Sequence, residues 1–347
     1  MGSDGGSLTL GDVVTLQRGT TYKSALLGQP GPVLLGLASI KRNGGFRDDN
    51  LKTYGGDSPE KLTLRPGDIY VSLKDVTQSA YLLGSIARVP PHIPAGRVTQ
   101  DTVKLSFIHK DVPSCYVYWL LRTPFYREYC RARAIGTTNL SLAREDFLAF
   151  PVPKPKAREL TLVETLDALD EKIELNRRMN QTIEALAQSI YKSWFVDPAA
   201  TKLPKGWRES TIGEEVRVVG GSTPSTTNSI FWDGGEHCWA TPKDLANLSS
   251  PVLLSTTHQI TEAGLEQIGS GILPVGTVLL SSRAPIGYLA ISEIPVSVNQ
   301  GFIAMVCDKT LPNHFVRLWT KNNMDAIEGR ANGTTFMEIS KSASEKS

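Results

Sequence analysis

Residues 161–194 read TLVETLDALDEKIELNRRMNQTIEALAQSIYKSW, a stretch without Pro or Gly in which one set of positions recurs in alternating steps of four and three. These seam positions are Leu162, Leu166, Leu169, Ile173, Asn176, Asn180, Ile183, Ala187, Ile190 and Trp194. A mostly apolar stripe with this period, kept over several heptads, predicts a long coiled-coil helix. We expect its interface with a partner helix to contain Leu166, Leu169, Ile173, Asn176, Asn180, Ile183, Ile190 and Trp194.

The ends of this helix are marked by capping signals. Thr161 and Glu164 have the spacing of a capping box, and Pro198 lies beyond the far end. A helix of about 35 residues, rising about 1.5 Å per residue, is a rod of about 50 Å that can serve as a spacer. Asn176 and Asn180 would set the register of a partner helix if they are buried in the seam. A frayed, solvated turn at these two positions is the other interpretation.

Composition bounds the class of protein. The chain has 347 residues, 40% of them hydrophobic and 21% charged, which is enough for two soluble domains and a connector. It contains no apolar run of about 18 residues, and the Gly- and Ser-rich start at 2–7 lacks the core of a signal peptide. We therefore expect a cytoplasmic protein that does not enter a membrane.

The four cysteines give no sign of a metal site. Cys115, Cys130, Cys238 and Cys307 are scattered, without C-x-x-C spacing or a nearby His pair. We expect reduced thiols and no metal. The net charge of +2 does not by itself indicate nucleic acid, because binding depends on where charge is concentrated.

The segments on either side of the predicted helix resemble each other at a spacing near 200 residues, which indicates a duplicated domain. Residues 10–14 and 19–21 match 212–216 and 221–223, and each copy is expected to open with a short strand and a turn. A turn and buried strand at 66–71 correspond to 275–280, and 98–100 correspond to 298–300. The strongest match joins Arg133-Ala-Ile-Gly-Thr-Thr138 to Arg330-Ala-Asn-Gly-Thr-Thr335.

Each copy is interpreted as short strands broken by Gly and Pro turns, followed by one helix and the Gly-Thr-Thr turn. The helices are predicted near 116–133 and 313–330. The fold class is therefore α+β, with two duplicated domains joined by a long coiled-coil helix. We place the first domain at 1–155, the helix at 156–198 and the second domain at 199–347.

The sequence contains no motif of an enzyme that works alone. We find no phosphate-binding loop, zinc-protease motif, nucleophile elbow or adenine-methyltransferase motif, and Gly220-Gly221 is better explained by a tight turn than by a dinucleotide site. We expect a non-catalytic chain with no cofactor of its own.

An excess of arginine between residues 122 and 144 is the main chemical signal. Arg122, Arg127, Arg131, Arg133 and Arg144 are accompanied only by Glu128 in most of that stretch. Arg127 and Arg131 lie one helical turn apart and could follow one phosphate backbone, and Arg133 leads to the hydroxyls of the Gly-Thr-Thr turn. An ordinary solvated helix face would show the same composition.

Further candidates lie in polar loops, where base-reading side chains are often carried. The complete set of candidate DNA-binding residues is Lys41, Arg42, Arg127, Arg131, Arg133, Thr137, Thr138, Lys243, Arg283, Arg330, Thr334 and Thr335. Gln100 and Gln300 could bind an adenine edge, although a hydrogen bond that fixes a strand end explains them equally well.

The helix sequence also carries a resemblance to a known family. Leu166, Asp167, Leu169, Asp170, Lys172, Ile173, Asn176, Arg177 and Asn180, followed by Ser-Trp-Phe-Val-Asp at 193–197, are similar to the central conserved region of type I restriction-modification specificity subunits. The resemblance continues through Leu203-Pro204, Gly206-Trp207, Gly221-Ser-Thr-Pro224, Trp239, Thr241-Pro-Lys-Asp-Leu245, Ser281-Ser-Arg-Ala284, Ile286-Gly287 and Asn299-Gln-Gly-Phe302.

This resemblance implies two target recognition domains, each reading half of a split double-stranded DNA sequence. The helix would set the gap and dock methyltransferase subunits. It further implies modification and restriction subunits as partners, which would bring S-adenosylmethionine, ATP and Mg. Family members carry a second long helix after the second domain, whereas this sequence stops at Ser347. We therefore expect a truncated member whose helix pairs with a second copy or with a modification subunit.

The competing hypothesis is a protein-binding scaffold that dimerises through the helix. A steep dependence of duplex DNA affinity on salt would distinguish a DNA reader from such a scaffold.

Overall fold

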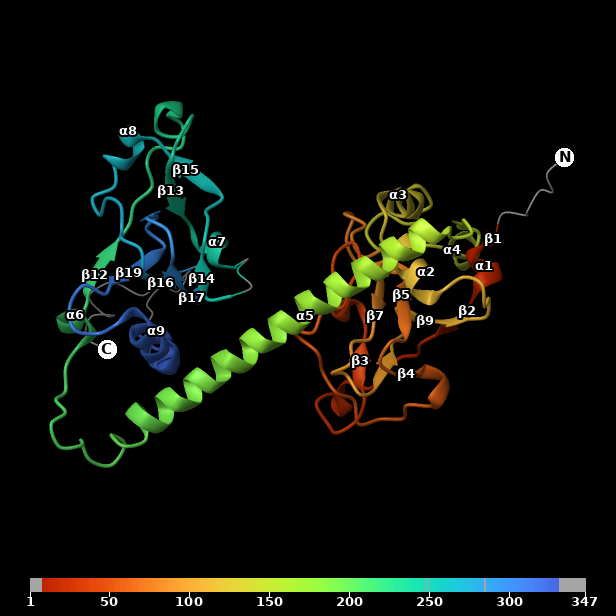
Figure 1. The fold of residues 1–347 in the computed structure, drawn as a ribbon, viewed down its shortest axis with the longest axis horizontal. Helices are drawn as coiled ribbons and strands as arrows, with labels where there is room; N and C mark the ends of the chain where they lie inside the picture. The colour runs from red at the N-terminus through yellow and green to blue at the C-terminus, as the bar shows by residue number, and fades with distance from the viewer. Residues whose placement is uncertain (1–7, 247, 249, 284, 331–347) are drawn as a thin grey trace. The chain divides into compact units, whose positions relative to one another are not determined.

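The computed structural model describes residues 8–246, 248, 250–283 and 285–330, which form two compact units, 1–172 and 173–347. The unit boundary falls within the long helix α5 (Ala157–Tyr191), which Figure 1 shows as one continuous green helix. The predicted boundaries at 155/156 and 198/199 remain predictions.

The first unit is built on a four-stranded antiparallel sheet. Its order is β2 (Val14–Arg18), β9 (Thr102–Phe107), β5 (Ile69–Ser72) and β7 (Ile86–Arg88). A second sheet contains β3 (Val33–Leu35), β8 (Gly96–Val98) and β4 (Thr63–Leu64), with β3 and β8 parallel. Two short pairs complete the strands, β1 (Leu8–Thr9) with β11 (Pro151–Val152) and β6 (Lys74–Asp75) with β10 (Leu140–Ser141).

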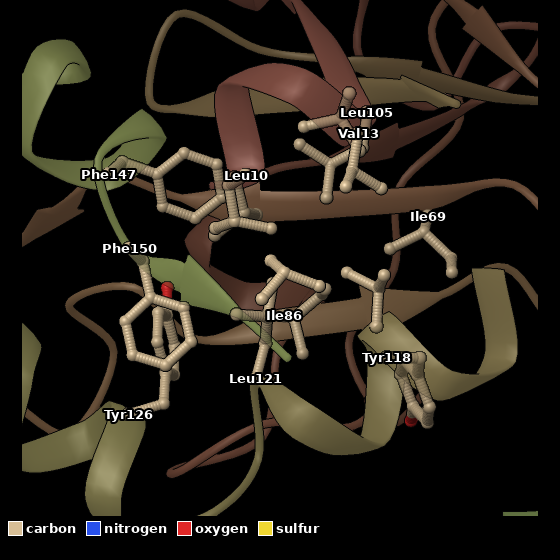
Figure 2. Packing of buried hydrophobic residues seen from close by; sticks show 14 of the residues in the cluster. Leu10, Val13, Ile69, Ile86, Leu105, Tyr118, Leu121, Tyr126, Phe147 and Phe150 are labelled. Carbon is tan, nitrogen blue, oxygen red and sulfur yellow. The ribbon is translucent and has the colours of Figure 1, made fainter. Parts of the chain in front are cut away.

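Helices cover one side of this four-stranded sheet and close its core. They are α1 (Leu10–Val13), α2 (Ser114–Leu120), α3 (Pro124–Ala132) and α4 (Arg144–Leu148), and short 3-10 turns lie at Ser24–Leu26, Leu37–Ser39 and Glu60–Leu62. Figure 2 shows the core between Ile69, Ile86 and Leu105 of the sheet and Leu121, Tyr126 and Phe150 of the helical side. Burial of these large side chains is the main stabilising contribution to the unit.

The second unit repeats this plan. Its main sheet has the order β12 (Arg217–Gly220), β19 (Phe302–Val306), β16 (Val278–Ser282), β17 (Ile286–Ser292) and β14 (Val252–Leu253). A three-stranded sheet contains β15 (His258–Ile260), β13 (His237–Ala240) and β18 (Ser297–Val298). The helices are α6 (Ile212–Glu215), α7 (Pro242–Ala246), α8 (Glu262–Leu265), α9 (Asn313–Asn322) and α10 (Met324–Glu328), with a 3-10 turn at Ser229–Phe231.

The strand orders confirm the predicted duplication. The order β2-β9-β5-β7 corresponds to β12-β19-β16-β17, and the parallel pair β3-β8 corresponds to β13-β18. In each copy a capped helical turn precedes the expected strand, because Thr9 with Asp12, and Thr211 with Glu214, form capping boxes. A Cβ on Gly19 would lie 2.1 Å from the Thr99 carbonyl oxygen, and one on Gly221 would lie 1.8 Å from that of Val298. These two glycines therefore allow the same close backbone contact in both copies.

The prediction of one helix near the end of each copy is wrong in one respect, because the structure has two shorter helices there in both copies. Thr123 caps α3 through a 3.3 Å hydrogen bond from the Tyr126 amide, and Pro124 occupies the first turn, where a missing N–H costs nothing. In the second copy the break falls at Asn323, whose side chain donates to the Trp319 carbonyl.

Helix α5 confirms the predicted long helix but begins before the predicted capping box at Thr161. Its first turn is capped by Glu159, whose carboxylate accepts a 2.7 Å hydrogen bond from the Lys156 amide. The predicted capping role of Thr161 is wrong, because its hydroxyl lies inside the helix and donates to the Ala157 carbonyl. At the far end the α-helix passes into a π-helical turn at Lys192–Val196 before Pro198.

Each unit holds its own part of α5 through a carboxylate of the helix. In the first unit Asp167 accepts hydrogen bonds from both terminal nitrogens of Arg88, at 3.1 and 3.0 Å, and from the Trp119 indole at 2.6 Å. In the second unit Glu184 accepts from both terminal nitrogens of Arg317, at 2.9 and 2.6 Å, and is joined by Lys321 at 3.2 Å. Bidentate contacts of this kind fix the orientation of the two side chains as well as the distance between them.

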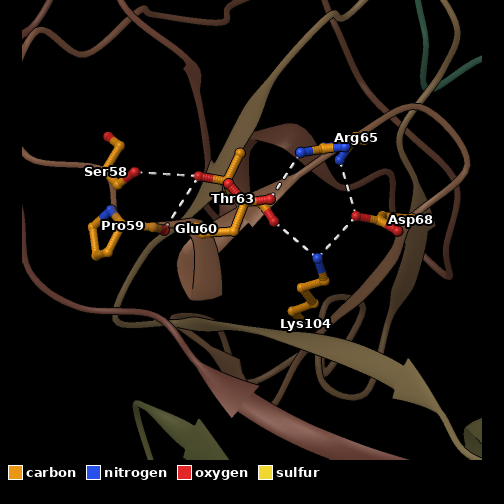
Figure 3. A network of polar contacts seen from close by, with 7 residues as sticks. All are labelled: Ser58, Pro59, Glu60, Thr63, Arg65, Asp68 and Lys104. Atoms are coloured by element: carbon orange, nitrogen blue, oxygen red, sulfur yellow. Dashed lines mark hydrogen bonds and ion pairs between the residues drawn. The ribbon is translucent and has the colours of Figure 1, made fainter.

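A polar network ties β4 to β9 in the first unit (Figure 3). The Lys104 ammonium donates to the Thr63 carbonyl at 2.9 Å and to Asp68 at 3.0 Å, while Asp68 also accepts from the Arg65 amide at 2.9 Å. The Lys104 ammonium therefore makes its contacts within the first unit.

Candidate nucleic-acid interface

Lys41 and Arg42 lie in a tight loop, residues 41–45. The Lys41 amide donates to the Gly45 carbonyl at 2.8 Å, and Gly44 and Gly45 both adopt a φ of 105°, which side chains rarely tolerate. Lys41 is half-buried, whereas Arg42 is exposed and places its guanidinium 5.4 Å from the centre of the Tyr81 ring. The loop therefore presents a cation beside an aromatic ring.

Thr137 and Thr138 lie at the tip of a hairpin, residues 135–141. Ile135 and Ser141 exchange two backbone hydrogen bonds, at 2.9 and 2.8 Å, and Gly136 has a φ of 114°. Both threonines are exposed. Because β10 in this hairpin pairs with β6, the threonines are carried next to the strand that bears Lys74.

Arg131 and Arg133 are exposed at the end of α3 that leads into this hairpin. The Arg133 guanidinium lies 3.7 Å from the centre of the Tyr129 ring, which orients it on the surface. Both remain available for phosphate contact, as predicted candidates.

The prediction that Arg127 contacts phosphate is wrong. Only 4% of Arg127 is exposed, and its guanidinium donates to the carbonyls of Ala80 at 2.8 Å, Tyr81 at 3.1 Å and Leu83 at 2.6 Å. Arg127 and Arg131 therefore do not follow one phosphate backbone together. The physical reason is that Arg127 faces the core beside Tyr126 and Cys130, where three carbonyl groups accept hydrogen bonds from its two terminal nitrogens.

Lys74 is a residue that the sequence analysis missed. It lies on β6, exposed, and its ammonium is 3.2 Å from Asp101. The strand registers place Val71 opposite Val103 and Leu280 opposite Ile303, so that Lys74 in the first copy corresponds to Arg283 in the second. Extending the repeat by three residues beyond 71 would have found this match.

In the second unit, Lys243 is exposed on α7, and Arg283 lies half-buried after β16. Asp244 fixes α7 by accepting from the amides and hydroxyls of Thr241 and Thr257 at 2.6–2.8 Å. Burial acts to raise the pKa of Asp244, but these hydrogen bonds outweigh it and leave the pKa below its usual value. Arg330 is exposed, and Thr334 and Thr335 lie outside the described residues.

The two glutamines behave as strand-end residues. The Gln300 side chain accepts a hydrogen bond from the Thr223 hydroxyl, and the Gln100 carbonyl accepts from Arg18 at 3.2 Å. The structural interpretation that the sequence left open therefore accounts for Gln300.

The seam of α5 is exposed. Exposure is 56% for Leu169, 49% for Ile173, 58% for Ile183 and 65% for Trp194, and Asn176 and Asn180 are exposed as well. Ile190 is exposed at 39%, and Leu166 is half-buried beside α2. Side chains of this kind form a larger apolar stripe than soluble proteins usually leave in water.

The described residues give no sign of a metal centre or a membrane-spanning helix. Among them, no group of three or more His, Cys, Asp or Glu is placed to hold a metal ion. None of the helices in the described ranges is long and apolar enough to cross a membrane.

Comparison with known proteins shows which proteins the chain is similar to. Residues 204–346 match the family model of the type I restriction modification DNA specificity domain. A 151-residue region, 43% of this chain, is 37% identical to the type I restriction enzyme MjaIX specificity subunit of Methanocaldococcus jannaschii. Residues 204–346 therefore carry a type I restriction modification DNA specificity domain, and the resemblance of the sequence to specificity subunits is confirmed.

A second specificity subunit, that of the type I restriction enzyme HindI from Haemophilus influenzae, is 20% identical over 267 residues, or 57% of this chain. The matched regions cover 35% of the MjaIX subunit and 57% of the HindI subunit. The fold is shared with the crystal structure of the type I restriction-modification S subunit from M. genitalium, at a TM-score of 0.57 and 13% identity, covering 98% of this chain and 86% of that one.

Proposed function

We propose that this specificity subunit recognises DNA sequence for a type I restriction-modification complex, with each unit reading one half of a bipartite target. The observation that carries the proposal is the duplication of one fold, with the same strand order in both copies, in a chain whose second copy matches the specificity-domain family. Two linked half-site readers gain affinity through their effective concentration on one DNA.

In this proposal the chain supplies recognition and its partners supply chemistry. Modification subunits would bring S-adenosylmethionine and restriction subunits would bring ATP and Mg, so no cofactor is assigned to this chain. The exposed cations Arg42, Arg131, Arg133 and Lys74 are suited to phosphate contact, which positions a protein on DNA without reading its sequence.

The test is an exchange of residues 1–150 for the first domain of another specificity subunit. The exchanged chain is expressed with the modification subunits of its system, and the methylated sequence is read from the genome by long-read sequencing. We expect one half of the bipartite motif to change and the other to stay the same. A change in both halves, or in neither, would show that the units do not read separately.

The second part of the proposal is that α5 sets the unread gap between the half-sites. A heptad inserted between Glu174 and Asn176 would lengthen the helix by about 10 Å, or roughly three base pairs, and would keep the seam in phase. We expect the methylated motif to gain about three unread positions. An unchanged gap would contradict a ruler role for the helix.

The exposed seam also supports self-association through a second copy. A two-fold axis beside residue 178 in an antiparallel pair places Leu162 opposite Trp194, Leu166 opposite Ile190, Leu169 opposite Ala187, Ile173 opposite Ile183 and Asn176 opposite Asn180. Every seam position thus meets another seam position, and the two amides meet each other. Paired amides satisfy their hydrogen bonds and specify one register.

Two experiments test this pairing. Replacing Leu169 and Ile173 with Asp places four charges in the seam of a dimer and should give a monomer in sedimentation velocity, while Ala168→Asp with Ala185→Asp, both exposed off the seam, should not. A monomeric unmutated chain at tens of micromolar would refute self-association.

The direction of the pair is tested by oxidation. Ile173→Cys together with Ile183→Cys should form a covalent dimer, because the two positions face each other across the antiparallel pair. Ile173→Cys alone should add little crosslinking to that of the unmutated chain, since each new thiol then faces an isoleucine. Equal crosslinking by the single variant would indicate a parallel pair instead.

A further inference from the structure

A surface loop between β6 and β7 is held in place more firmly than its exposure would suggest. This loop, residues 76–82 and hereafter the Tyr81 loop, exposes 61% of Val76 and 39% of Tyr81, and Gln78 and Ser79 are also exposed. Ala80 adopts a φ of 52°, which is rare for a residue with a side chain. Such a conformation persists only where the surroundings enforce it.

Two buried charged residues provide that enforcement. The Asp75 carboxylate, 1% exposed, accepts hydrogen bonds from the Thr77 amide at 2.8 Å, the Thr77 hydroxyl at 2.9 Å and the Leu82 amide at 2.7 Å. From the opposite side Arg127 donates to the carbonyls of Ala80, Tyr81 and Leu83. An anionic acceptor thus holds the amides of the loop and a cationic donor holds its carbonyls.

The burial of Asp75 and Arg127 costs free energy, because removing a charged group from water is unfavourable unless its hydrogen bonds are replaced. A loop that only joined two strands would not need two buried charged residues. The second copy shows this, since there Ser282 of β16 pairs with Ile286 of β17 and three residues make the connection. The Tyr81 loop is therefore an addition to the shared fold and belongs to the first unit.

The surroundings of the loop suit nucleic acid. The loop contacts the 41–45 loop through the Asn43 amide, which donates to the Tyr81 carbonyl at 2.9 Å, and through Arg42 over the Tyr81 ring. It follows β6 directly, and β6 pairs with the hairpin that carries Thr137 and Thr138. A cation, hydroxyls, an amide side chain and an aromatic ring thus lie on connected segments of one unit.

We propose that the Tyr81 loop reads base edges in the half-site of the first unit, with Gln78 and Tyr81 as its specificity-determining side chains. This inference rests on the proposed function. Gln78 carries a donor and an acceptor in one plane, the group that pairs with an adenine edge in the major groove. Tyr81 offers a flat apolar ring, and Arg42 beside it offers a phosphate contact. Arg127 and Asp75 are positioning residues that hold the loop ready.

The experiment uses the full chain assembled with the modification subunits of its system. The half-site of the first unit is identified by the exchange of residues 1–150. Methylation rates are then measured on the target duplex and on duplexes with single base changes in either half. For Gln78→Ala with Tyr81→Ala we expect discrimination at one or two base pairs of the first half to fall on the order of tenfold to a hundredfold. Discrimination in the second half should stay the same.

The second half-site is an internal control for folding, because the same chain must read it. Arg127→Met should produce the same loss in the first half, and Arg127→Lys should restore part of it, since an ammonium can still bind some of the carbonyls. Arg42→Ala should instead weaken binding evenly across sequences and reduce the slope of log affinity against log salt by about one. A purely structural Arg127 would alter both halves or neither.

Unchanged discrimination in the first half of the Gln78 and Tyr81 variant overturns the inference and leaves the proposed function standing. An equal loss in both halves also overturns it, because the loop would then act through the whole complex. If the sequence that the unmutated complex methylates does not depend on this chain, the proposed function itself fails, and the inference fails with it.

Discussion

The contact between Glu184 and Arg317 gives the sharpest prediction about stability. Arg317 has a side-chain exposure of 9% and Glu184 of 22%, and the pair is joined by two hydrogen bonds with Lys321 beside it. Glu184→Gln keeps the shape of the side chain but removes its charge. The variant leaves the Arg317 guanidinium in a nearly closed site without a counter-ion, and breaking a buried pair in this way is destabilising.

The pKa of Glu184 gives the magnitude. The hydrogen bond from Arg317, against the opposing effect of burial and with further help from Gln188 and Lys321, lowers this pKa from 4.5 to about 2. A pKa lowered from 4.5 to about 2 corresponds to roughly 3 kcal/mol of stability at neutral pH. Because the carboxylate keeps some contact with water, we reduce the expected loss in the variant to about 2 kcal/mol.

The sign of the pH dependence follows from the lowered pKa. Above pH 4.5 the carboxylate is ionised in both the folded and the unfolded chain, so the full contribution is present. As the pH falls from 4.5 towards 2, the unfolded chain takes up a proton first and the contribution is lost, to under half by about pH 3. The difference between the unmutated chain and the variant should shrink over that range.

Hydrogen exchange of the full chain, resolved by peptide, measures the effect where it arises. A loss of about 2 kcal/mol should speed exchange of the α9 amides about thirtyfold at pH 7, while the α2 amides in the first unit keep their rates. Glu171→Gln, at an exposed position of the same helix, is the control and should change neither. Equal α9 exchange in the Glu184 variant and the unmutated chain, or a urea-denaturation difference that persists at pH 3, would refute the reasoning.

Three further predictions concern other parts of the fold. Gly221→Ala should cost about 3 kcal/mol or more in thermal denaturation because its Cβ would collide with a strand carbonyl, whereas Gly220→Ala, with no atom within 4 Å of its Cβ, should cost far less. Burial raises the pKa of the Cys307 thiol to about 11, so at pH 8 mass spectrometry should find it labelled about a hundredfold more slowly than a thiol of ordinary pKa 9.0, and equal labelling would contradict that burial. Asp167→Asn should lower the stability of the first unit by about 1–3 kcal/mol in urea denaturation, and an unchanged midpoint would show that its contact contributes nothing.

The parts of the fold that sequence could predict are those that depend on local patterns. The heptad of α5 is such a pattern, because its period appears in any window of the helix, and the matched segments on either side of it predicted that the two copies share one fold. The start of α5 was misplaced because Thr161 fits a capping box as well as a true cap does. Only the contact between Glu159 and the Lys156 amide decides between them.

The candidate interface was predicted less well, because a count of charges along a segment does not show which side chains face the core. Arg127 was counted with its exposed neighbours, yet its guanidinium donates hydrogen bonds to three carbonyls that lie more than forty residues away in sequence. Lys74 was missed because the repeat was compared only as far as residue 71. The strand registers show that the match continues to Lys74 and Arg283, just before the Tyr81 loop interrupts it.

The two carboxylates that hold α5 also explain how one helix can serve two purposes. Asp167 and Glu184 lie off the seam, and each fixes its own part of the helix to its own unit, while Leu169, Ile173 and Ile183 stay exposed. The contacts that hold each unit on α5 are therefore made outside the seam through which we propose that α5 pairs. Substitutions in the seam should change assembly without loosening the units from α5, and Glu184→Gln should do the reverse.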